Sequence, residues 1–300
     1  MATQADIAFH YDVDNHFYGL FLDQAHHAYS CAAWDGATTL EEAQQQKLSR
    51  LAHFAGMAAG HHVLDIGCGW GSMLDYAVGL RGAATATGLT LSEDQYSYVL
   101  DKASPEITIS LMSWRDFAPA TRFDALVSIG AFEHFASLED RDNNRHRQVY
   151  ADFFAWSRAV STDNARLGLQ TIITARAPES LQEVRDTRYL LEHVFPGSAL
   201  PGMSDIQAGM QDHYDVCECR HIGLDYARTL AQWRLRLRLR LRLRLRLQAH
   251  RTIIEARYGE ALYQHYDHDF QAAERSFQAG VVSLAQLSLA PVRRAMSFRR

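Results

Sequence analysis

The sequence lacks the features that would place it in a membrane or outside the cell. No apolar stretch in its 300 residues approaches the roughly 20 residues that a bilayer-spanning helix needs. The first ten residues show no basic segment followed by an apolar one, which predicts that there is no secretory signal. We therefore expect a protein of the reducing cytoplasm.

Cysteine is scarce as well, and the histidines are scattered. Two of the four cysteines stand in Cys217-Glu218-Cys219, which is neither a disulfide framework nor the paired CxxC spacing of a zinc site. The adjacent pairs His26-His27 and His61-His62 have no partners at metal-ligand spacing. We expect no bound metal.

The remaining composition is that of a globular protein, with 47% hydrophobic and 22% charged residues. Length alone allows one or two domains. The net charge of −5 is unevenly distributed, because seven arginines lie within residues 234–246 and leave about −12 for the remainder.

The most informative segment is residues 63–71, VLDIGCGWG, a short apolar run that ends in three alternating glycines. It predicts a buried strand, a tight turn that a ligand can approach closely, and the N-terminus of a helix. A dinucleotide site would carry an acidic residue at the end of the second strand, but that strand runs into GLTLS at residues 88–92. The spacing favours S-adenosylmethionine over NAD; the alternative is a glycine-rich turn that binds nothing.

Strand and helix patterns alternate along the chain. Thr39 predicts a helix N-cap and Gly60 the end of that helix. We expect strands at residues 63–66, 84–89, 107–111, 123–129 and 167–175. This order indicates an α/β fold, a Rossmann-like doubly wound and mainly parallel sheet.

We expect one domain over residues 1–300. It would comprise an N-terminal helical segment (1–58), a cofactor-binding core (59–176), and a helical lid insertion with the C-terminal part (177–300). Phe195-Pro196-Gly197 and Leu200-Pro201-Gly202 punctuate the lid, which has too little apolar content for a core of its own.

Residues 234–247 alternate arginine and leucine. Strict alternation suits a strand with one leucine face, although both flanks are helical in pattern. One interpretation is an expanded repeat that lengthens a surface helix or loops out. The other is contact with an anionic membrane, worth up to ~1 kcal/mol per arginine. No aromatic residues stand between the arginines to stack on bases, so we expect no nucleic-acid partner.

Several further segments carry a resemblance. They are residues 29–34 (YSCAAW), 64–71 (LDIGCGWG), 88–95 (GLTLSEDQ), 114–117 (WRDF), 128–135 (SIGAFEHF), 195–197 (FPG) and 226–230 (YARTL). In order and spacing the chain resembles the cyclopropane-fatty-acid synthase-like methyltransferases, of the mycolic acid cyclopropane synthase type, over roughly residues 10–290.

The resemblance implies an S-adenosylmethionine site. The glycine loop would line the methionine and ribose, while a hydroxyl and an amide replace the missing acid at the ribose and adenine. Trp114 and Arg115 would border the adenine. The implied cofactor residues are Tyr29, Ser30, Asp65, Gly67, Cys68, Gly69, Gly71, Thr90, Leu91, Gln95, Trp114, Arg115 and Ile129.

The resemblance also implies a catalytic set around a bound bicarbonate, which in ring-forming members takes up the proton that the transferred methyl group loses. The matching residues are Cys31, Glu133, Gln170, Ile172 and Tyr226. The family has histidine where this chain has Gln170. Glutamine can donate an N–H to an anion but cannot carry a proton charge, so the departure concerns ring closure and not methyl transfer.

These observations imply a methyltransferase that acts on an alkene carbon of a fatty acyl or lipid-like substrate. Fold alone does not choose the acceptor. The alternatives are O-methylation of a fatty-acid carboxylate, methylation of a small-molecule amine, and a non-catalytic protein that binds the cofactor or docks on membranes. The oligomeric state is open, with a homodimer as one alternative.

Overall fold

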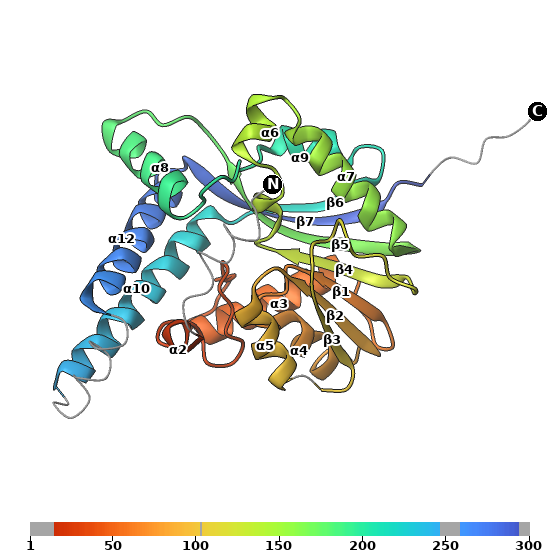
Figure 1. The fold of residues 1–300 in the computed structure, drawn as a ribbon, viewed down its shortest axis with the longest axis horizontal. Coiled ribbons are helices and arrows are strands. Elements are labelled where there is room, and N and C mark those ends of the chain that lie inside the picture. Colours follow the sequence, from red (N-terminus) through yellow and green to blue (C-terminus); the bar gives the residue numbers. More distant parts are fainter. Residues whose placement is uncertain (1–14, 103, 247–258, 294–300) are drawn as a thin grey trace, which may run out of the picture.

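The computed structural model describes residues 15–102, 104–246 and 259–293, which form a seven-stranded sheet flanked by helices (Figure 1). The strand order is β3-β2-β1-β4-β5-β7-β6. The first five strands are parallel, and β7 runs antiparallel to both of its neighbours. The strands are β1 (His62–Ile66), β2 (Thr85–Thr90), β3 (Ile107–Leu111), β4 (Phe123–Ile129), β5 (Ser161–Thr174), β6 (Tyr214–His221) and β7 (Val282–Pro291).

The predicted doubly wound, mainly parallel sheet is therefore confirmed. Four predicted strands match within a residue or two, but β5 begins at Ser161 rather than at residue 167. The strands β6 and β7 were not predicted. They complete the sheet as an antiparallel pair beyond β5.

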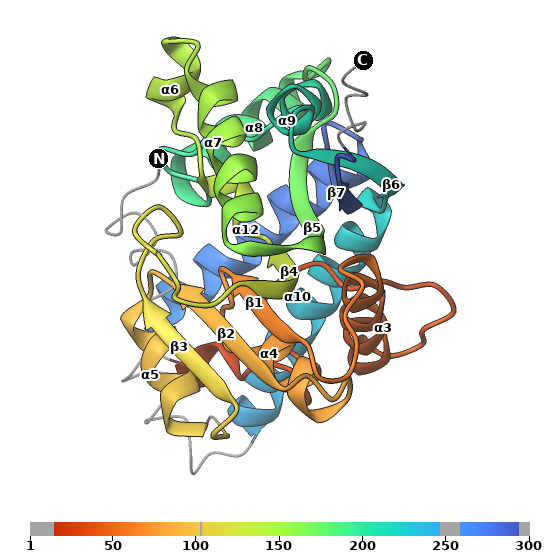
Figure 2. The same ribbon diagram turned by 90° about the vertical axis from the view of Figure 1, so that its right-hand side faces the viewer.

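Helices cover both faces of the sheet (Figure 2). Strand β1 shows the alternation, because Val63 packs in a cluster with α3 and α4, while Leu64 and Ile66 pack in a cluster with α7 and α9. The helices are α2 (Asn15–Tyr18), α3 (Leu40–Phe54), α4 (Ser72–Gly79), α5 (Glu93–Lys102), α6 (Leu138–Asp142), α7 (His146–Ala159), α8 (Leu181–His193), α9 (Met203–Met210), α10 (Gly223–Arg246) and α12 (Gly259–Gln278), with a 3₁₀ turn at Phe132–His134.

Helix α3 begins as predicted and ends earlier. Thr39 is the N-cap, and it forms a reciprocal capping box with Glu42. The helix ends at Phe54, where Gly56 adopts a left-handed φ of 63° and its N–H bonds to the carbonyl of His53. The prediction that Gly60 closes this helix is wrong, because Gly56 already supplies the left-handed residue.

The arginine–leucine run is helical rather than extended. It forms the second half of α10, which lies beside α12 (Figure 1), and only Leu247 falls outside the described residues. Trp233 and Leu237, one helical turn apart, are each 1% exposed, whereas Leu235 and Leu239 are about half exposed. One apolar stripe therefore continues from the flanking sequence into the repeat.

The first three arginines of the run are ion-paired to the body of the protein. Arg236 binds the carboxylate of Glu41 on α3 at 2.7 Å, and Arg234 and Arg238 bind Asp267 on α12 at 3.0 and 2.8 Å. The start of the repeat is thus part of the packed structure and does not loop out. No helix in the described ranges is both long enough and apolar enough to cross a bilayer.

Candidate active site

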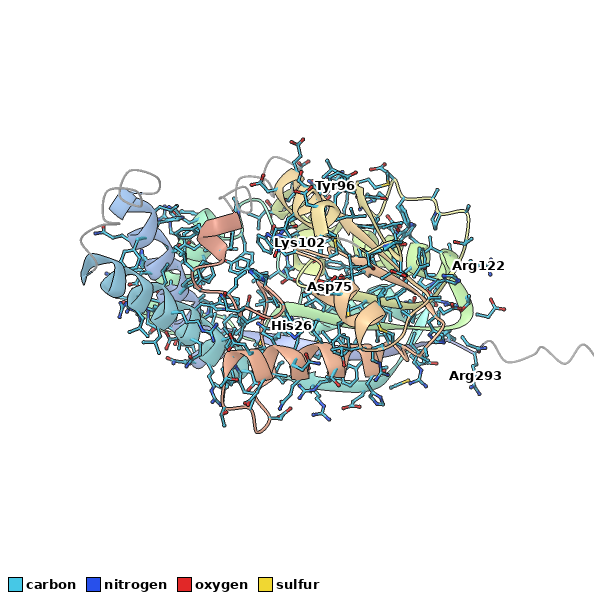
Figure 3. All side chains as sticks on the ribbon, turned by 90° about the horizontal axis from the view of Figure 1, so that it is seen from below. His26, Asp75, Tyr96, Lys102, Arg122 and Arg293 are labelled. Atoms are coloured by element: carbon cyan, nitrogen blue, oxygen red, sulfur yellow. The ribbon has the colours of Figure 1, made fainter. Side chains whose placement is uncertain are left out.

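A pocket lies at the carboxyl ends of β1, β2 and β4, where the loops after these strands meet the segment that precedes α3. In Figure 3, Arg122, just before β4, and Arg293, just after β7, lie at the end of the molecule away from α10 and α12. Strand β4 therefore points its carboxyl end toward these two helices. This is the edge at which a doubly wound sheet binds ligands.

The glycine loop is shaped by close contacts. The N–H groups of Gly67 and Cys68 both bond to the carbonyl of Leu89, at 3.0 and 2.9 Å. Gly67 has a φ of 81°, and a Cβ there would lie 2.4 Å from the Cβ of Ala131. Gly69 is also left-handed, at 56°, but has nothing within 4 Å of an added Cβ. The loop thus needs Gly67 for packing and leaves open space at Gly69.

Most of the predicted cofactor residues line this first pocket. They are Tyr29, Ser30, Asp65, Gly67, Cys68, Gly69, Thr90, Leu91, Gln95, Trp114 and Ile129. Two lie outside its lining. Gly71 is the left-handed N-cap of α4, and the guanidinium of Arg115 covers the Trp114 ring, 4.6 Å from its centroid. Their part in binding stays a prediction.

The end of β2 carries neutral polar groups in place of an acid. The hydroxyl of Thr90 donates to the amide oxygen of Gln95 at 2.8 Å, and it also accepts from the Ser92 N–H at 3.2 Å. Because its oxygen is occupied by Thr90, the Gln95 amide has N–H groups to offer a ligand. These side chains suit ribose hydroxyls or an adenine ring nitrogen.

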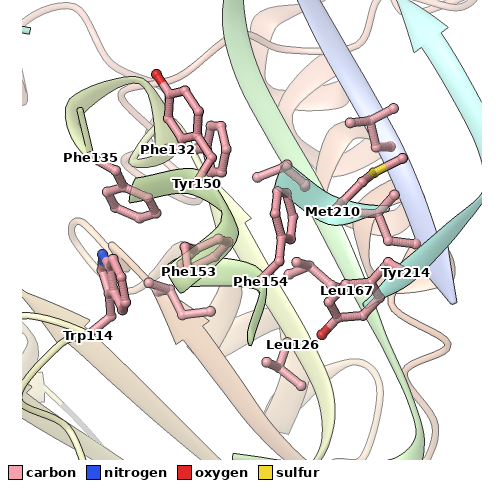
Figure 4. Packing of buried hydrophobic residues seen from close by; sticks show 14 of the residues in the cluster. Trp114, Leu126, Phe132, Phe135, Tyr150, Phe153, Phe154, Leu167, Met210 and Tyr214 are labelled. Atoms are coloured by element: carbon pink, nitrogen blue, oxygen red, sulfur yellow. The ribbon is translucent and has the colours of Figure 1, made fainter. Parts of the chain in front are cut away.

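Trp114 belongs both to the core and to the pocket wall. It is 5% exposed and packs on an aromatic cluster beneath α7, with Phe135 and Phe153 at centroid distances of 5.6 and 5.4 Å (Figure 4). Its indole N–H has no hydrogen-bond partner among the described residues. A buried N–H without a partner destabilises the folded protein unless a ligand or a water molecule accepts its hydrogen bond.

Asp65 is the acidic group of the first pocket. It is 2% exposed, and burial raises the pKa of its carboxyl to about 7, against the opposing effect of Lys47. Its Oδ1 atom has no hydrogen-bond partner among the described residues. An orphaned carboxylate oxygen in a pocket is a natural contact for a cationic group of a ligand. This orphaned oxygen and the open space beside Gly69 fit S-adenosylmethionine, which carries cationic groups.

A second, mostly apolar pocket adjoins the first between α8, α10 and α12. It takes in all five predicted catalytic residues. The two pockets share Tyr29, Ser30, Gly130 and His134, so they meet at one wall. Aliphatic and aromatic side chains dominate the rest of the second lining, including Leu190, Leu191, Val194, Phe195, Leu200, Leu230, Trp233, Phe270, Phe277 and Leu284. This lining suits an acyl chain.

Glu133 lies near the junction of the pockets. It is 3% exposed, and its Oε2 accepts a hydrogen bond from the Thr171 hydroxyl at 2.8 Å. Burial raises the pKa of this carboxyl to about 7, against the hydrogen bonds that lower it. The group can therefore hold a proton or release it near neutral pH.

Gln170 is held by a hydrogen-bonded chain within the sheet. Its Nε2 donates to the carbonyl of Cys31 at 3.4 Å, and its Oε1 accepts from Gln286 on β7 at 2.7 Å. The oxygen of Gln286 in turn accepts from Arg50 at 2.9 Å. The second N–H of the Gln170 amide can still donate to a ligand. Burial keeps the pKa of the Cys31 thiol well above its usual range, so this thiol stays protonated. These groups fit a small anion only when Glu133 carries a proton to share with it.

Lys47, Trp70 and His134 are among the pocket-lining residues that were not predicted. Lys47 and Trp70 line the first pocket, and His134 lines both pockets. His134 accepts or donates a hydrogen bond at Ser198 over 3.1 Å, and burial lowers its pKa to about 4, so the ring is neutral. Trp70 and His134 lie within the motifs at residues 64–71 and 128–135, which was the available signal; nothing local distinguishes Lys47 from a solvated helix lysine.

Comparison with known proteins shows that the chain is similar to mycolic acid cyclopropane synthetases and related methyltransferases. The family model described as mycolic acid cyclopropane synthetase matches residues 1–287. The chain is similar to the S-adenosylmethionine-dependent methyltransferase UmaA of Mycobacterium tuberculosis, with 30% identity over 93% of this chain and 94% of the relative. It is also similar to cyclopropane mycolic acid synthase 2 of Mycobacterium bovis, with 32% identity over 93% and 92%. A crystal structure of mycolic acid cyclopropane synthase CmaA1 complexed with SAH and CTAB superposes with a TM-score of 0.81, at 27% identity over 96% and 98% of the two chains.

Proposed function

Because the chain belongs to the mycolic acid cyclopropane synthetase family, we propose that it transfers a methyl group from S-adenosylmethionine to an alkene carbon of a fatty acyl or lipid-like substrate. It is an S-adenosylmethionine-dependent methyltransferase. The observation that carries the acceptor assignment is the pair of adjoining pockets, one lined by the glycine loop, Asp65, Thr90 and Gln95, the other lined mainly by aliphatic and aromatic side chains. The relatives UmaA, cyclopropane mycolic acid synthase 2 and methoxy mycolic acid synthase MmaA3, at 30% identity or more, are not named for a carboxylate or amine acceptor.

The cofactor's sulfonium supplies an already activated methyl group, so alignment accounts for most of what the protein must do. Tyr29 and Ser30, which border both pockets, orient the two ligands toward each other. The Thr90–Gln95 pair and Trp114 hold the nucleoside end, and the aliphatic wall of α8 and α10 excludes water. In this proposal residues 59–176 bind the cofactor, while residues 1–58 and 177–300 cover it and form the acceptor pocket.

Attack by an alkene leaves a carbocation on the acceptor, which must lose a proton. Glu133, buried at the junction and with a pKa near 7, is placed to receive or relay that proton. Gln170 cannot take it, and its role is to position the Cys31 carbonyl. Alternatively, bicarbonate held by Cys31, Glu133 in its protonated form, Gln170, Ile172 and Tyr226 would be the proton acceptor in place of Glu133.

A deuterium label tests this proposal. Purified protein is incubated with S-adenosylmethionine carrying a trideuterated methyl group and either with a phospholipid bearing monounsaturated chains or with the free monounsaturated fatty acid, whose carboxylate can be esterified. The lipids are examined by mass spectrometry before and after saponification. Carbon methylation leaves the label on the fatty acid. A cyclopropane ring has lost one deuteron, whereas a methyl-branched alkene keeps all three. Label removed by saponification would indicate a methyl ester and would refute the alkene acceptor.

Three finer points stay predictions. Contact of the arginine–leucine run with an anionic membrane would show as salt-sensitive binding to anionic vesicles, since exposed charges are screened within ~8 Å at physiological ionic strength. The homodimer alternative and a cytoplasmic location are likewise part of this proposal.

A further inference from the structure

Lys47 is a buried lysine for which neither the sequence motifs nor the proposed chemistry has a role. It lies in the middle of α3, is 1% exposed, and lines the first pocket. Its ammonium donates to the hydroxyl of Ser30 at 2.9 Å, its sole hydrogen bond within the described part of the chain. Burial lowers its pKa to about 8. An ammonium held away from water is costly unless an anion accompanies it.

The acidic groups around Lys47 do not satisfy it. Asp23 is buried nearby, but its two carboxylate oxygens accept the backbone N–H groups of His26 and Ala28 at 2.6 and 2.9 Å. Asp65 acts on Lys47 through its charge, without a hydrogen bond or ion pair to it among the described contacts, and one of its oxygens is orphaned. The Cys31 thiol is kept protonated by burial. The pocket therefore holds one cation and one anion, each with bonding capacity left.

We propose that Lys47 binds the carboxylate of the cofactor's amino-acid end, with the Ser30 hydroxyl beside it, while Asp65 binds the α-ammonium of the same group. The amino-acid end of S-adenosylmethionine and of S-adenosylhomocysteine is a zwitterion, so it brings one anion and one cation. Paired buried charges fit a zwitterion better than either charge alone, because each ion then has a partner. This inference rests on the proposed function, which puts the cofactor in this pocket.

The competing explanation is structural: Lys47 merely ties the segment around Ser30 to α3. The two explanations differ in which ligands should bind more weakly when the lysine is replaced. A carboxylate contact matters only for ligands that carry a carboxylate, whereas a structural tie affects every ligand of the pocket equally.

Calorimetric titration of two ligands separates them. S-Adenosylhomocysteine and its decarboxylated analogue, which keeps the amine, are titrated into the wild type, Lys47→Met and Lys47→Gln. We expect the wild type to prefer S-adenosylhomocysteine by roughly 10- to 100-fold, the size of one charge-assisted hydrogen-bonded contact. Both variants should lose that preference by weakening S-adenosylhomocysteine alone. The two proteins and the two ligands form a double-mutant cycle, which gives the interaction free energy between the Lys47 side chain and the ligand carboxylate.

Asp65→Asn is the matched control, because both ligands carry the ammonium and should weaken together while the preference stays. Thermal unfolding checks that each variant is folded; Lys47→Gln retains a donor for Ser30 if Lys47→Met does not fold. Equal binding of the two ligands by the wild type, or equal weakening of both in the lysine variants, would overturn the assignment of Lys47. Failure of the wild type to bind either ligand would instead count against the proposed function.

Discussion

The glycine loop allows one test in which two neighbouring substitutions should act in different ways. Gly67→Ala and Gly69→Ala both add a single methyl group to a left-handed residue. At Gly67 the new carbon would lie 2.4 Å from the Ala131 Cβ, and at Gly69 it would enter open space in the first pocket. The first change should therefore strain the protein itself, and the second should mainly obstruct the ligand.

The magnitudes follow from two costs. A left-handed conformation costs a residue with a Cβ about 1–2 kcal/mol, and both variants bear this cost. Gly67→Ala adds overpacking of roughly 1–3 kcal/mol, for about 2–5 kcal/mol in total. At roughly 2 °C per kcal/mol for a chain of this size, the melting temperature should fall by about 4–10 °C in Gly67→Ala and by about 2–4 °C in Gly69→Ala.

Thermal unfolding with and without S-adenosylhomocysteine measures both effects. Gly67→Ala should show the larger loss without ligand. Gly69→Ala should show the smaller loss without ligand and a much reduced stabilisation by ligand, because its methyl group occupies ligand space. The reasoning is refuted if Gly69→Ala is the less stable apoprotein, or if ligand stabilises it as much as the wild type.

Two further outcomes are expected. Burial raises the pKa of Glu133 from 4.5 to about 7 in the folded state, so the folded protein binds this proton more tightly than the unfolded chain, and stability should fall as pH rises through that interval. The melting temperature, measured at several pH values, should fall less steeply with pH in Glu133→Gln than in the wild type. An unchanged slope would contradict the burial argument. In the arginine–leucine run, Leu237→Ala removes a side chain that is 1% exposed and should lower the unfolding free energy by about 2–5 kcal/mol. The control Leu239→Ala, at a residue that is 47% exposed, should change the unfolding free energy by no more than about 0.5 kcal/mol. Equal losses in denaturant titrations would mean that this part of α10 does not pack as described.

The central strands could be predicted because they are short apolar runs buried on both faces. Residues 63–66 and 123–129 are of this kind, and their strands are correct. The beginning of β5 was missed because Thr162, Asp163 and Asn164 are polar and lie where the pairing with β4 shifts register, between Ser161 and Arg166. Strand β6 is exposed at most of its positions, so it carries no core signal of its own.

Other errors have a tertiary cause. Alternation of arginine and leucine by itself suits a strand, but the interpretation that the repeat lengthens a helix is confirmed. Trp233 and Leu237 reach the same apolar cluster only on a helix, and acidic partners from α3 and α12 neutralise the first arginines. Lys47 is the reverse case. A lysine in an amphipathic helix ordinarily predicts a solvated face, and only the packing of the segment before α3 over it places this one inside a pocket.

The wall shared by the two pockets has a thermodynamic consequence. Tyr29 and Ser30 border both pockets, so a ligand in one pocket that orders this segment leaves less ordering for a ligand in the other. Binding of cofactor and acceptor is then linked, and linkage is reciprocal: the factor by which a bound lipid tightens the nucleoside ligand must equal the factor by which that ligand tightens the lipid. Loss of the methyl group from the cofactor would change this factor, so that release of the demethylated cofactor and release of the modified chain become coupled events.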